Sequence, residues 1–543
     1  MNKLPLSRRR FLQLVGLGFA WFASMGKGCA AKADVKSVTT KPKVVVIGAG
    51  LGGLCCAAHL ARAGFPVTVV EQHSVPGGYA SSFTRGRFNF EVSLHATSLA
   101  DHAAGGQLES LGIRERIELV ELPALYRLKT ADLDITVPEK DPDEFIKRLT
   151  QHFPAEKEGI TEFIHDLVKL AEVVHNLERY RHSVFKLLMS LPYLTLWRIR
   201  NKTLARWLDS YTQDPGAREV LAALWGYFGL PPSRLSAFYF AVGTGGFLRD
   251  GAYYIRPRSQ SLSTVLAEVI QEAGGKIQYG TAVEKIHIRN GAVEGISLTH
   301  GTQLPAQVVV SNANALDTFN RMLPAGTVST EYKNKLAEYR PSISSFIVWL
   351  GLNRDITDLV ENYNNHFSSG RGPEADYQSC LEGDVEHGSF IVMLYDKLYK
   401  GYSRPGASTV QILFLSGFEP WRRFEEDYRA GHKQAYDEQK NRWAEVLIRR
   451  AEQNIVPGLS SMIEVREAAT PLTNWRFTRN LQGAIYGFEQ ATNNTFYKRI
   501  QNRTPVNGLY LASAWGNPGA GYSAVLAAGQ MAYQDIVSDW VKA

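Results

Sequence analysis

The sequence predicts an α/β fold whose first domain is built on a parallel sheet covered on both faces. Three neighbouring features carry this prediction. Residues 44–47 are an unbroken apolar run, as in a strand buried on both faces. A G-x-G-x-x-G motif follows at once, and residues 65–70 form a second apolar run that ends at Glu71. Together they indicate a strand, a helix and a parallel second strand.

The three motif glycines, Gly48, Gly50 and Gly53, have distinct tasks. The first makes the tight turn, the second lets the backbone approach a pyrophosphate, and the third lets helix and strand pack closely. Residues 51–63 are then expected to form the helix, and Gly64 to end it. The phosphates are expected on the helix N-terminus, where free N–H groups and the helix dipole favour anions. The alternative is a glycine turn without a ligand, and the flanking strands argue against it.

Glu71 indicates which dinucleotide binds. It lies 23 positions after Gly48, where an acidic residue accepts hydrogen bonds from a ribose 2′-hydroxyl. A carboxylate at this place repels a 2′-phosphate. The loop therefore fits FAD or NAD better than NADP.

The residues after Glu71 resemble a known family. The stretch EQHSVPGGYASSF, followed by GRFNFEVSLH, is similar to the FAD loop of the phytoene desaturase, carotenoid isomerase and retinol saturase group of flavoproteins. The resemblance returns near the C-terminus, in residues 470–473, 480–487 and 508–522. It covers nearly all of the chain after the N-terminal segment and implies FAD as the cofactor.

The resemblance also implies the domain organisation. It indicates an FAD-binding Rossmann-type domain of the glutathione reductase kind and a second, α+β substrate domain. The FAD domain is expected from residues 41–100, 250–325 and 465–543. The substrate domain, which is expected to face a membrane, comprises residues 101–249 and 326–464.

Within the FAD domain, the sequence itself indicates a hairpin and a helix. Residues 284–289 and 292–298 flank Asn290 and Gly291, a strong signal for a two-residue turn. Residues 259–273 are expected to form a helix closed by two glycines. These elements agree with the β-meander of the resembled FAD domains.

Most cofactor-binding positions are implied by the resemblance. Gly77 and Gly78 pass beneath the flavin end of FAD, where only residues without side chains allow close approach. The backbone of Val283 holds the adenine. A helix that opens after residues 517–522 faces the flavin pyrimidine, where its N-terminus stabilises negative charge on the reduced flavin. The full expected set is Gly48, Gly50, Gly52, Gly53, Glu71, Gln72, Gly77, Gly78, Ser81, Val283, Trp515, Asn517, Pro518 and Gly519.

His95 is the candidate catalytic residue. It follows the FAD loop directly, and the resembled family keeps a residue near the flavin at this place. A histidine titrates close to working pH, so it is suited to donate or accept a proton. The alternative, a structural histidine beside an apolar run, is the commoner role. Glu91 is expected to anchor the cofactor or the backbone.

Residues 1–33 have the features of an export signal. Residues 7–12, SRRRFL, resemble the twin-arginine motif, and a short apolar stretch at 11–25 follows. Residues 31–33, AKA, offer a cleavage site. The twin-arginine route carries folded proteins, which suits a flavoprotein that takes up FAD in the cytoplasm. A periplasmic or exported protein is expected, peripheral on the membrane, with a lipid anchor at Cys29 as the minor alternative.

Composition excludes several classes of function. The chain has 543 residues, of which 45% are hydrophobic, enough for two large cores. Residues 1–33 contain six of the 60 basic residues and none of the 53 acidic ones. The chain after residue 33 therefore has a net charge of only +1. This charge gives no indication of a nucleic-acid partner. The four cysteines show no disulfide framework or metal-binding pattern, and no metal is expected. No P-loop or Ser-His-Asp arrangement points to phosphoryl transfer or hydrolysis.

The expected second domain mixes helices and strands. Residues 101–250 are expected to be mostly helical, with an amphipathic helix at 159–177. Residues 181–208 interleave aromatic and basic side chains, which fits a membrane interface and equally a buried hairpin with basic rims. Three strands are expected at 344–351, 389–395 and 411–415. A helix is expected at 434–453.

The expected function is that of an exported FAD-dependent oxidoreductase acting on a long apolar polyene or isoprenoid lipid. The resemblance implies desaturation, saturation or cis-trans isomerisation. Outside the cytoplasm, a quinone, oxygen or a redox-neutral flavin cycle is expected in place of NAD(P)H. Two alternatives stay open: a flavin amine or amino-acid oxidase, and a flavin-containing carrier without catalysis.

Overall fold

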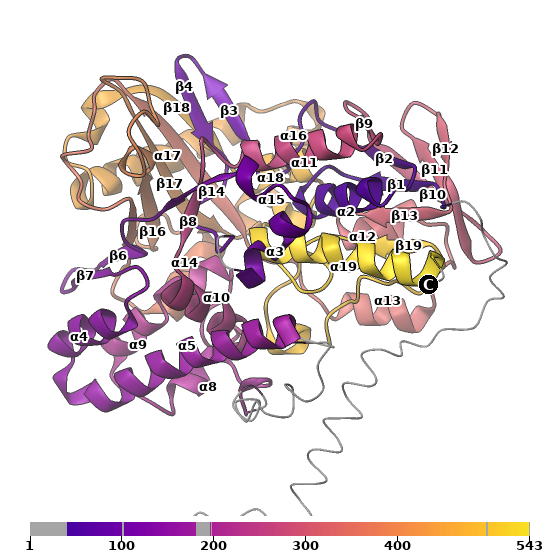
Figure 1. Cartoon of the computed structure of the whole chain (residues 1–543). Helices are drawn as coiled ribbons and strands as arrows, with labels where there is room; N and C mark the ends of the chain where they lie inside the picture. The colour runs from indigo at the N-terminus through magenta and orange to yellow at the C-terminus, as the bar shows by residue number, and fades with distance from the viewer. Residues whose placement is uncertain (1–40, 100–101, 181–195, 197, 496–497, 542–543) are drawn as a thin grey trace, which may run out of the picture. The chain divides into compact units, whose positions relative to one another are not determined.

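The apolar run that opens the fold is the central strand of a parallel sheet. This computed structural model describes residues 41–99, 102–180, 196, 198–495 and 498–541 (Figure 1). The expected signal peptide lies outside the described residues, as does most of the aromatic and basic stretch 181–208. All elements below belong to the unit Pro42–Ala543.

The parallel sheet has five strands in the order β19, β13, β1, β2, β9. These are β1 (Val44–Ile47), β2 (Val67–Val70), β9 (Lys276–Gln278), β13 (Val308–Ser311) and β19 (Leu509–Leu511). In β1, Val44 and Val46 join one hydrophobic core, whereas Val45 and Ile47 join another. Because side chains alternate between the faces of a strand, two cores explain the continuous apolar run. The prediction of a sheet buried on both faces is confirmed.

Three helices cover one face of this sheet. They are α2 (Leu51–Arg62), α11 (Gln260–Glu272) and α19 (Tyr522–Trp540). Figure 1 shows α2 and α19 side by side, although they come from opposite ends of the chain. All three were expected from sequence, and their apolar residues share the core of Val44 and Val46.

A three-stranded antiparallel sheet covers the other face. It consists of β10 (Val283–Arg289), β11 (Ala292–Leu298) and β12 (Gln303–Pro305). Asn290 and Gly291 connect the first two strands with φ values of 52° and 75°. Positive φ at both central residues is the signature of a tight hairpin turn, so the hairpin prediction is confirmed.

A second, seven-stranded sheet has the order β18, β14, β17, β16, β15, β6, β7. Its strands are β6 (Tyr126–Lys129), β7 (Asp134–Val137), β14 (Ser344–Leu352), β15 (Asn364–Phe367), β16 (Phe390–Leu394), β17 (Ser408–Ser416) and β18 (Ile463–Ala469). The strands expected near 344, 389 and 411 are confirmed as β14, β16 and β17. Strand β18 crosses the expected domain boundary at residue 465, and the division into two domains stays a prediction.

The expectation of a mostly helical segment from residue 101 to 250 is wrong for its first part. Besides β6 and β7, it contains β5 (Glu118–Glu121), which pairs with β8 (Tyr253–Arg256). Each of these early strands has only four residues, of which one or two are charged. So short an alternation leaves no clear period in the sequence. Strands β3 (Ser82–Arg85) and β4 (Phe88–Glu91) form a separate hairpin.

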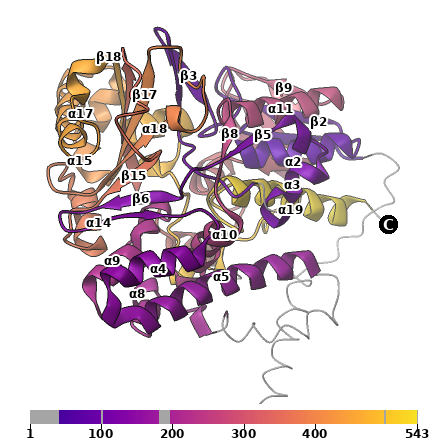
Figure 2. The same cartoon turned by 60° about the vertical axis from the view of Figure 1, so that its left-hand side comes forward.

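Most remaining helices lie beside the seven-stranded sheet or in a helical group around α5 and α10 (Figure 2). The amphipathic helix expected at 159–177 is confirmed as α5, and that expected at 434–453 as α17. Helix α10 packs closely on α5, because a Cβ on Gly245 would meet the carbonyl oxygen of Leu167 at less than 3.0 Å. The helices are α3 (His102–Ser110), α4 (Pro142–His152), α5 (Lys157–Tyr180), α8 (Leu204–Leu208), α9 (Pro215–Leu221), α10 (Ala237–Asp250), α12 (Ala315–Asp317), α13 (Thr330–Ala337), α14 (Pro373–Glu382), α15 (Glu419–Arg422), α16 (Glu425–Ala430), α17 (Gln434–Asn454) and α18 (Pro471–Thr478).

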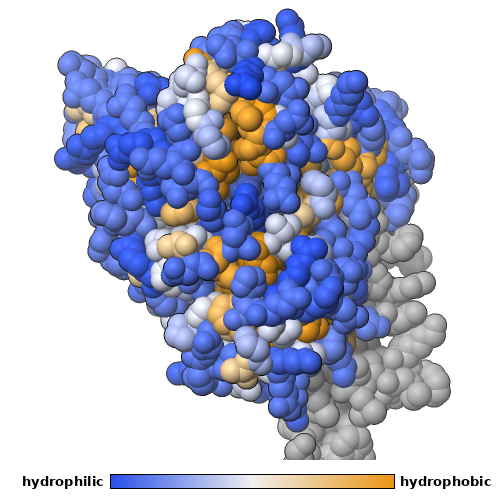
Figure 3. All heavy atoms as spheres, turned by 90° about the vertical axis from the view of Figure 1, so that its left-hand side faces the viewer, coloured by the Kyte–Doolittle hydropathy of each residue, from blue (hydrophilic) through white to orange (hydrophobic). Residues whose placement is uncertain are grey.

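Within the described part of the chain, no helix combines the length and apolar character that crossing a bilayer needs. One face of the molecule shows hydrophobic residues at the surface in several separate areas, with hydrophilic residues between them (Figure 3).

Candidate active site

The first glycine loop is closed so tightly that side chains have no room. Gly48 has a φ of +91°, in the region that favours glycine. A Cβ on Gly50 would meet the side chain of Asn312 at less than 3.0 Å, and one on Gly53 would meet the carbonyl of Gly48. Gly52 packs equally closely on the carbonyl of Ala512. The four glycines thus form the close-fitting backbone cradle that the motif predicts.

Asn312 joins the ends of three neighbouring strands, β1, β13 and the edge strand β19, and its role was not found from sequence. It follows β13 directly, and its Oδ1 accepts a hydrogen bond from the Gly50 N–H (3.1 Å). Its Nδ2 donates to the carbonyl of Ala512, just after β19. The sequence shows only that Asn312 is a polar residue directly after an apolar strand. Polar residues are common at that position, so the pattern did not indicate a special role.

Glu71 lies where the dinucleotide motif requires it. Its carboxylate is buried and accepts hydrogen bonds from the backbone N–H groups of Ala49 (2.6 Å) and His73 (2.9 Å). A carboxylate has about four lone-pair sites, so it retains acceptor capacity for a ribose hydroxyl. The Thr281 N–H donates to the Glu71 carbonyl (2.9 Å), which brings the segment before Val283 beside Glu71. The adenine role of Val283 stays a prediction.

The second glycine pair lies against the first loop. The Gly77 N–H donates to the carbonyl of Ala49 (2.7 Å), and the φ values of Gly77 and Gly78 are +126° and +60°. A Cβ on Gly78 would lie 3.7 Å from the Cα of Gly50. Both loops therefore border one space.

Gln72 and Ser81 hold these loops in place. The Gln72 Nε2 donates to the carbonyl of Phe477 (3.1 Å), in the last turn of α18. The Ser81 hydroxyl donates to the carbonyl of Gly78 (2.8 Å). Both side chains are thus engaged with the protein itself, and a direct contact of either with FAD stays a prediction.

The C-terminal end of the chain closes onto the same loops. A Cβ on Gly529 of α19 would meet the carbonyl of Gly52 at less than 3.0 Å, so α19 packs directly on α2. The hydroxyl of Tyr522 lies 3.4 Å from that of Ser93, and the hydroxyl of Ser523 lies 3.1 Å from that of Ser98. The N-terminus of α19 therefore adjoins the segment after the FAD loop.

Neither α2 nor α19 has a side-chain cap or an acidic residue in its first turn. Helix N-termini present N–H groups without intrahelical partners, and an anion is the complementary ligand. Two such termini border the glycine loops. The site therefore fits a cofactor that carries a pyrophosphate at one helix and an acidic ring system at the other, as FAD does.

The loop before α19 is held by a buried cation that the sequence did not reveal. Arg499 is fully buried. Its guanidinium donates to the carbonyls of Ala514 (2.6 Å) and Gly516, to Tyr239 (3.2 Å) and to Gln490 (3.3 Å). Among the described residues no carboxylate pairs with it. The charge of Arg499 is therefore available to an anionic group at this loop.

The expected residues of this loop are placed by the surrounding protein. Trp515 is buried and donates from its indole to Asn480 (3.2 Å). The Asn517 N–H donates to Asn502 (3.0 Å), and the carbonyl of Pro518 accepts from Tyr239 (3.2 Å). Gly519 has a φ of +132°, and a Cβ on it would lie 3.3 Å from the guanidinium carbon of Arg499. These residues shape the start of α19, and their contact with FAD stays a prediction.

Five aromatic side chains border enclosed space beside this site. Each retains accessible surface, yet desolvation shifts the pKa of each away from its ordinary value. A ring on the outer surface would be solvated and keep its ordinary pKa. Accessible surface that opens into the protein interior accounts for both properties. We call this space the aromatic chamber; its lining includes Tyr79, His95, Tyr227, Tyr486 and Tyr522.

Contacts link these residues in two groups, and the Tyr79 hydroxyl, which donates to the carbonyl of Ala484 (3.5 Å) two residues before Tyr486, brings the groups together. The ring of His95 lies 6.0 Å from that of Tyr227. Tyr486 donates from its hydroxyl to the carbonyl of Gly226 (3.1 Å), next to Tyr227. The Tyr522 hydroxyl donates to the carbonyl of Tyr79 (3.5 Å). The aromatic chamber thus reaches from the N-terminus of α19 toward the seven-stranded sheet.

His95 lines the chamber as a neutral group. Burial lowers its pKa to about 3, so the imidazole is uncharged at pH 7. Its Nε2 is buried without a hydrogen-bond partner. A pKa this low makes His95 a weak proton acceptor, and its role in catalysis stays a prediction.

Glu91, by contrast, is fully engaged with the protein. Its carboxylate accepts from the N–H (2.9 Å) and hydroxyl (2.6 Å) of Ser259 and from the hydroxyl of Tyr254 (3.0 Å). Burial raises its pKa, and these hydrogen bonds oppose that rise. Glu91 therefore ties the end of β4 to the start of α11, in agreement with the expected anchoring role.

Three buried neutral histidines make stability depend on pH. Burial lowers the pKa of His95 and His366 to about 3 and that of His59 to about 4. Below the ordinary pKa of 6.5, the unfolded chain binds protons that the folded chain does not. The free energy of unfolding should therefore fall as pH drops from 6.5, by about 2 kcal/mol per histidine at pH 5.

Urea titrations at pH 7.5 and pH 5 measure this loss. Between pH 7.5 and pH 5, the free energy of unfolding of a His59→Gln variant should fall by about 2 kcal/mol less than that of the original chain. The variant lacks one of the three histidines that the unfolded chain protonates. An equal loss in both proteins would contradict the assignment of His59 as a buried neutral residue.

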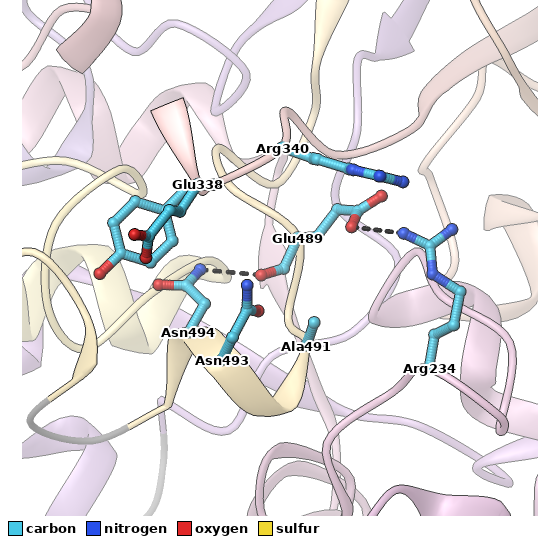
Figure 4. Close-up of a pocket in the computed structure, with 8 residues that line it drawn as sticks. Arg234, Glu338, Arg340, Glu489, Ala491, Asn493 and Asn494 are labelled. Atoms are coloured by element: carbon cyan, nitrogen blue, oxygen red, sulfur yellow. Dashed lines mark hydrogen bonds and ion pairs between the residues drawn. The ribbon is translucent and has the colours of Figure 1, made fainter. Parts of the chain in front are cut away.

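A separate polar pocket of about 300 Å³ lies behind the loop before α19 (Figure 4). In it, Arg234 pairs with Glu489 (2.6 Å), and Arg340 points toward the same carboxylate. The Tyr239 hydroxyl contacts the carbonyls of both Asn494 and Pro518, each at 3.2 Å, and so separates the pocket from the loop. A lining this charged does not suit an apolar ligand.

The fold and this site define an FAD-dependent oxidoreductase. Residues 51–534 match the family described as flavin containing amine oxidoreductase. The chain belongs to this family.

Curated relatives agree with the family and cover nearly the whole chain. Prolycopene isomerase from Daucus carota is 25% identical over 91% of this chain and 80% of its own length. Phytoene desaturase (neurosporene-forming) from Rhodobacter capsulatus is 26% identical over 91% of this chain and 94% of its own. All-trans-retinol 13,14-reductase from Rattus norvegicus is 25% identical over 93% and 88%. The family resemblance read from the sequence is confirmed.

Solved structures show the same fold at lower identity. An oxidoreductase from Methanosarcina mazei superposes with a TM-score of 0.58 at 16% identity, over 91% of this chain and all of the other. A putrescine oxidase double mutant gives 0.60 at 14%, over 92% and 99%. The expected FAD-binding α/β fold is thereby confirmed.

Proposed function

We propose that the protein desaturates, saturates or isomerises a long apolar polyene or isoprenoid lipid. The observation that carries this proposal is the aromatic chamber beside the N-terminus of α19. Its rings are uncharged at pH 7, since burial lowers the pKa of His95 to about 3 and a tyrosine is neutral at this pH even at its ordinary pKa. Aromatic surface removed from water suits an apolar substrate. The names of the three curated relatives support the same substrate class.

FAD supplies the redox chemistry, and the protein binds the cofactor and the substrate. When bound, FAD supplies hydride transfer to or from the carbon skeleton. Gly48, Gly50 and Gly53 hold the pyrophosphate, and the N-terminus of α19 together with Arg499 provides positive potential for negative charge on the cofactor. The chamber orients the polyene and excludes water.

Anaerobic incubation of the purified holoprotein with a panel of polyenes tests the proposal. Bleaching of the flavin absorbance indicates that the polyene is oxidised. A changed isomer without bleaching indicates isomerisation, and a polyene consumed only after prior reduction of the flavin indicates saturation. No change in flavin or polyene under any of these conditions would contradict the proposal.

The same preparation separates the proposal from amine oxidation. An amine or amino-acid oxidase binds a polar substrate and releases peroxide when oxygen is present. Among the described chamber residues, none is a free carboxylate that could hold an ammonium group, since Glu91 is engaged with Ser259 and Tyr254. We therefore expect no peroxide release with diamines, cyclic amines or amino acids.

Export through the twin-arginine route is part of this proposal, with a quinone or oxygen as electron acceptor and the membrane surface as the source of substrate. It is supported by the residues SRRRFL and the apolar stretch after them. Replacing Arg8 and Arg9 by lysine should trap the precursor inside the cell, because that route reads the arginine pair. Cell fractionation and immunoblotting measure this. Undiminished export of the double variant would contradict the proposed route.

A further inference from the structure

The polar pocket behind the loop before α19 carries an excess positive charge at one end. Glu489 lines this end, and its carboxylate pairs with Arg234 (2.6 Å). The guanidinium of Arg340 points toward the same carboxylate (Figure 4). Burial raises the pKa of Glu489, and the charges of both arginines oppose that rise. One carboxylate therefore faces two cations, and one positive charge is left over for a ligand.

A negative charge lies at the opposite end of the same pocket. Figure 4 shows the carboxylate of Glu338 on the far side of the pocket from both guanidiniums. Within the part of the chain that the structure describes, neither Glu338 nor Arg340 forms an ion pair or a side-chain hydrogen bond. Both residues are exposed, so a ligand from solution reaches their charged groups. The pocket thus offers one unpaired cation and one unpaired anion, at separate places.

This separation of charge restricts the ligand. A plain anion would be attracted by the arginines and repelled by Glu338, and a plain cation or a metal ion would meet the reverse. A molecule with one charge of each sign satisfies both ends. Guanidinium groups bind carboxylate and phosphate oxygens well, and a carboxylate accepts hydrogen bonds from an ammonium group. The volume of about 300 Å³ is at the lower end of the range for small-molecule sites, so the ligand is small.

We propose that this pocket binds a small zwitterion, with its oxyanion at Arg340 and Arg234 and its ammonium group at Glu338. The amide of Asn493, which also lines the pocket, has a donor and an acceptor and can bond to either group. Small amino acids have this chemistry, and so does phosphoethanolamine, either free or as a lipid head group. The inference goes beyond the proposed function and does not depend on the polyene.

The position of the pocket indicates that its ligand is bound but not oxidised. The hydroxyl of Tyr239 contacts the carbonyls of Asn494 and Pro518, each at 3.2 Å, and so stands between the pocket and the loop before α19. The aromatic chamber lies on the other side of that loop region, at Tyr79 and Tyr522. A zwitterion in the pocket should therefore leave the flavin oxidised.

Anaerobic calorimetric titration of the holoprotein at pH 7.5 tests the inference with matched probes. Glycerophosphoethanolamine carries both charges, dimethyl phosphate only the anion, and ethanolamine only the cation. We expect glycerophosphoethanolamine to bind with a Kd of about 1 mM or lower, and about tenfold more tightly than either single-charge probe. β-Alanine has a carboxylate in place of the phosphate, and binding of either zwitterion supports the inference.

A competition experiment distinguishes the two sources of the phosphoethanolamine group. Phosphatidylcholine vesicles with and without phosphatidylethanolamine are added to the complex with glycerophosphoethanolamine. Displacement that requires phosphatidylethanolamine identifies a lipid head group as a ligand, whereas no displacement identifies a free zwitterion. The flavin absorbance is recorded throughout and should stay that of oxidised FAD.

Surface variants locate the two charges. Arg340→Gln and Glu338→Gln should each weaken glycerophosphoethanolamine about tenfold, since each variant lacks one charged contact. Glu338→Gln should not weaken dimethyl phosphate, because that probe has no ammonium group. The controls are Glu331→Gln at the start of α13 and Arg354→Gln, two exposed residues outside the pocket that should leave both affinities unchanged.

Three results would overturn the inference. Equal affinity for glycerophosphoethanolamine and dimethyl phosphate would show a plain anion site without a role for Glu338. No binding of either zwitterion would show that the pocket takes no such ligand. Bleaching of the flavin by a zwitterion would place that ligand at the flavin itself. The polyene assay uses other ligands and another readout, so the proposed function stands or falls separately.

Discussion

A Gly50→Val variant should purify without yellow colour and should not take up added FAD. Gly50 lies where the first loop turns into α2, and its N–H donates to Asn312. A Cβ at this position would meet the Asn312 side chain at less than 3.0 Å. The valine therefore displaces the asparagine that joins β1 to β19, and it also projects into the space where the pyrophosphate is expected.

Flavin content per chain, measured from absorbance after denaturation, decides this prediction. The control is Gly246→Val in α10, where a Cβ would meet nothing within 4 Å. That variant should keep stoichiometric flavin and show that an added side chain is not harmful by itself. Stoichiometric FAD in Gly50→Val would contradict the assignment of the loop.

The second large effect is expected at Arg499. An Arg499→Leu variant leaves the carbonyls of Ala514 and Gly516 without their buried donor, together with Gln490. Each buried acceptor without a partner costs about 1–3 kcal/mol. We expect the free energy of unfolding to fall by about 4 kcal/mol and FAD to bind more weakly, because the loop before α19 loses its support.

Arg503 provides the control for this substitution. It lies four residues further on, is 44% exposed and pairs with Asp539 at the surface (2.8 Å). Because exposed ion pairs contribute little, Arg503→Leu should change the free energy of unfolding by no more than about 1 kcal/mol. Urea titration of both holoproteins measures the difference. Equal, small changes would show that Arg499 does not support the loop.

The sequence predicted those parts of the fold in which a short local pattern is compatible with only one structure. Val44 to Ile47 had to be buried on both faces, and the structure places a hydrophobic core on each. The turn at Asn290 and Gly291 follows from its residues alone. The strands β5, β6 and β7 were not predicted, because four residues are too few to show a clear period in the sequence.

The site was predictable where a motif fixes its members, and not where distant residues meet. The glycines and Glu71 were proposed from sequence because their spacing is typical of the path of a dinucleotide. Asn312 was missed because its partner Ala512 lies 200 positions away in the chain. Arg499 was missed because its partners Ala514 and Gly516 lie 15 and 17 positions away. No local sequence pattern encodes such contacts. The chamber likewise arises from separate segments of the chain, and only His95 among its residues stood out.

A crystal structure of the yellow holoprotein tests the central claim most directly: the two ends of the chain enclose one flavin beside the aromatic chamber. The account predicts continuous FAD density from Glu71 past Gly50 to the N-terminus of α19, with one face of the flavin open toward Tyr227. Flavin rings found away from Ser93 and Tyr522, or closed off from the chamber, would contradict it.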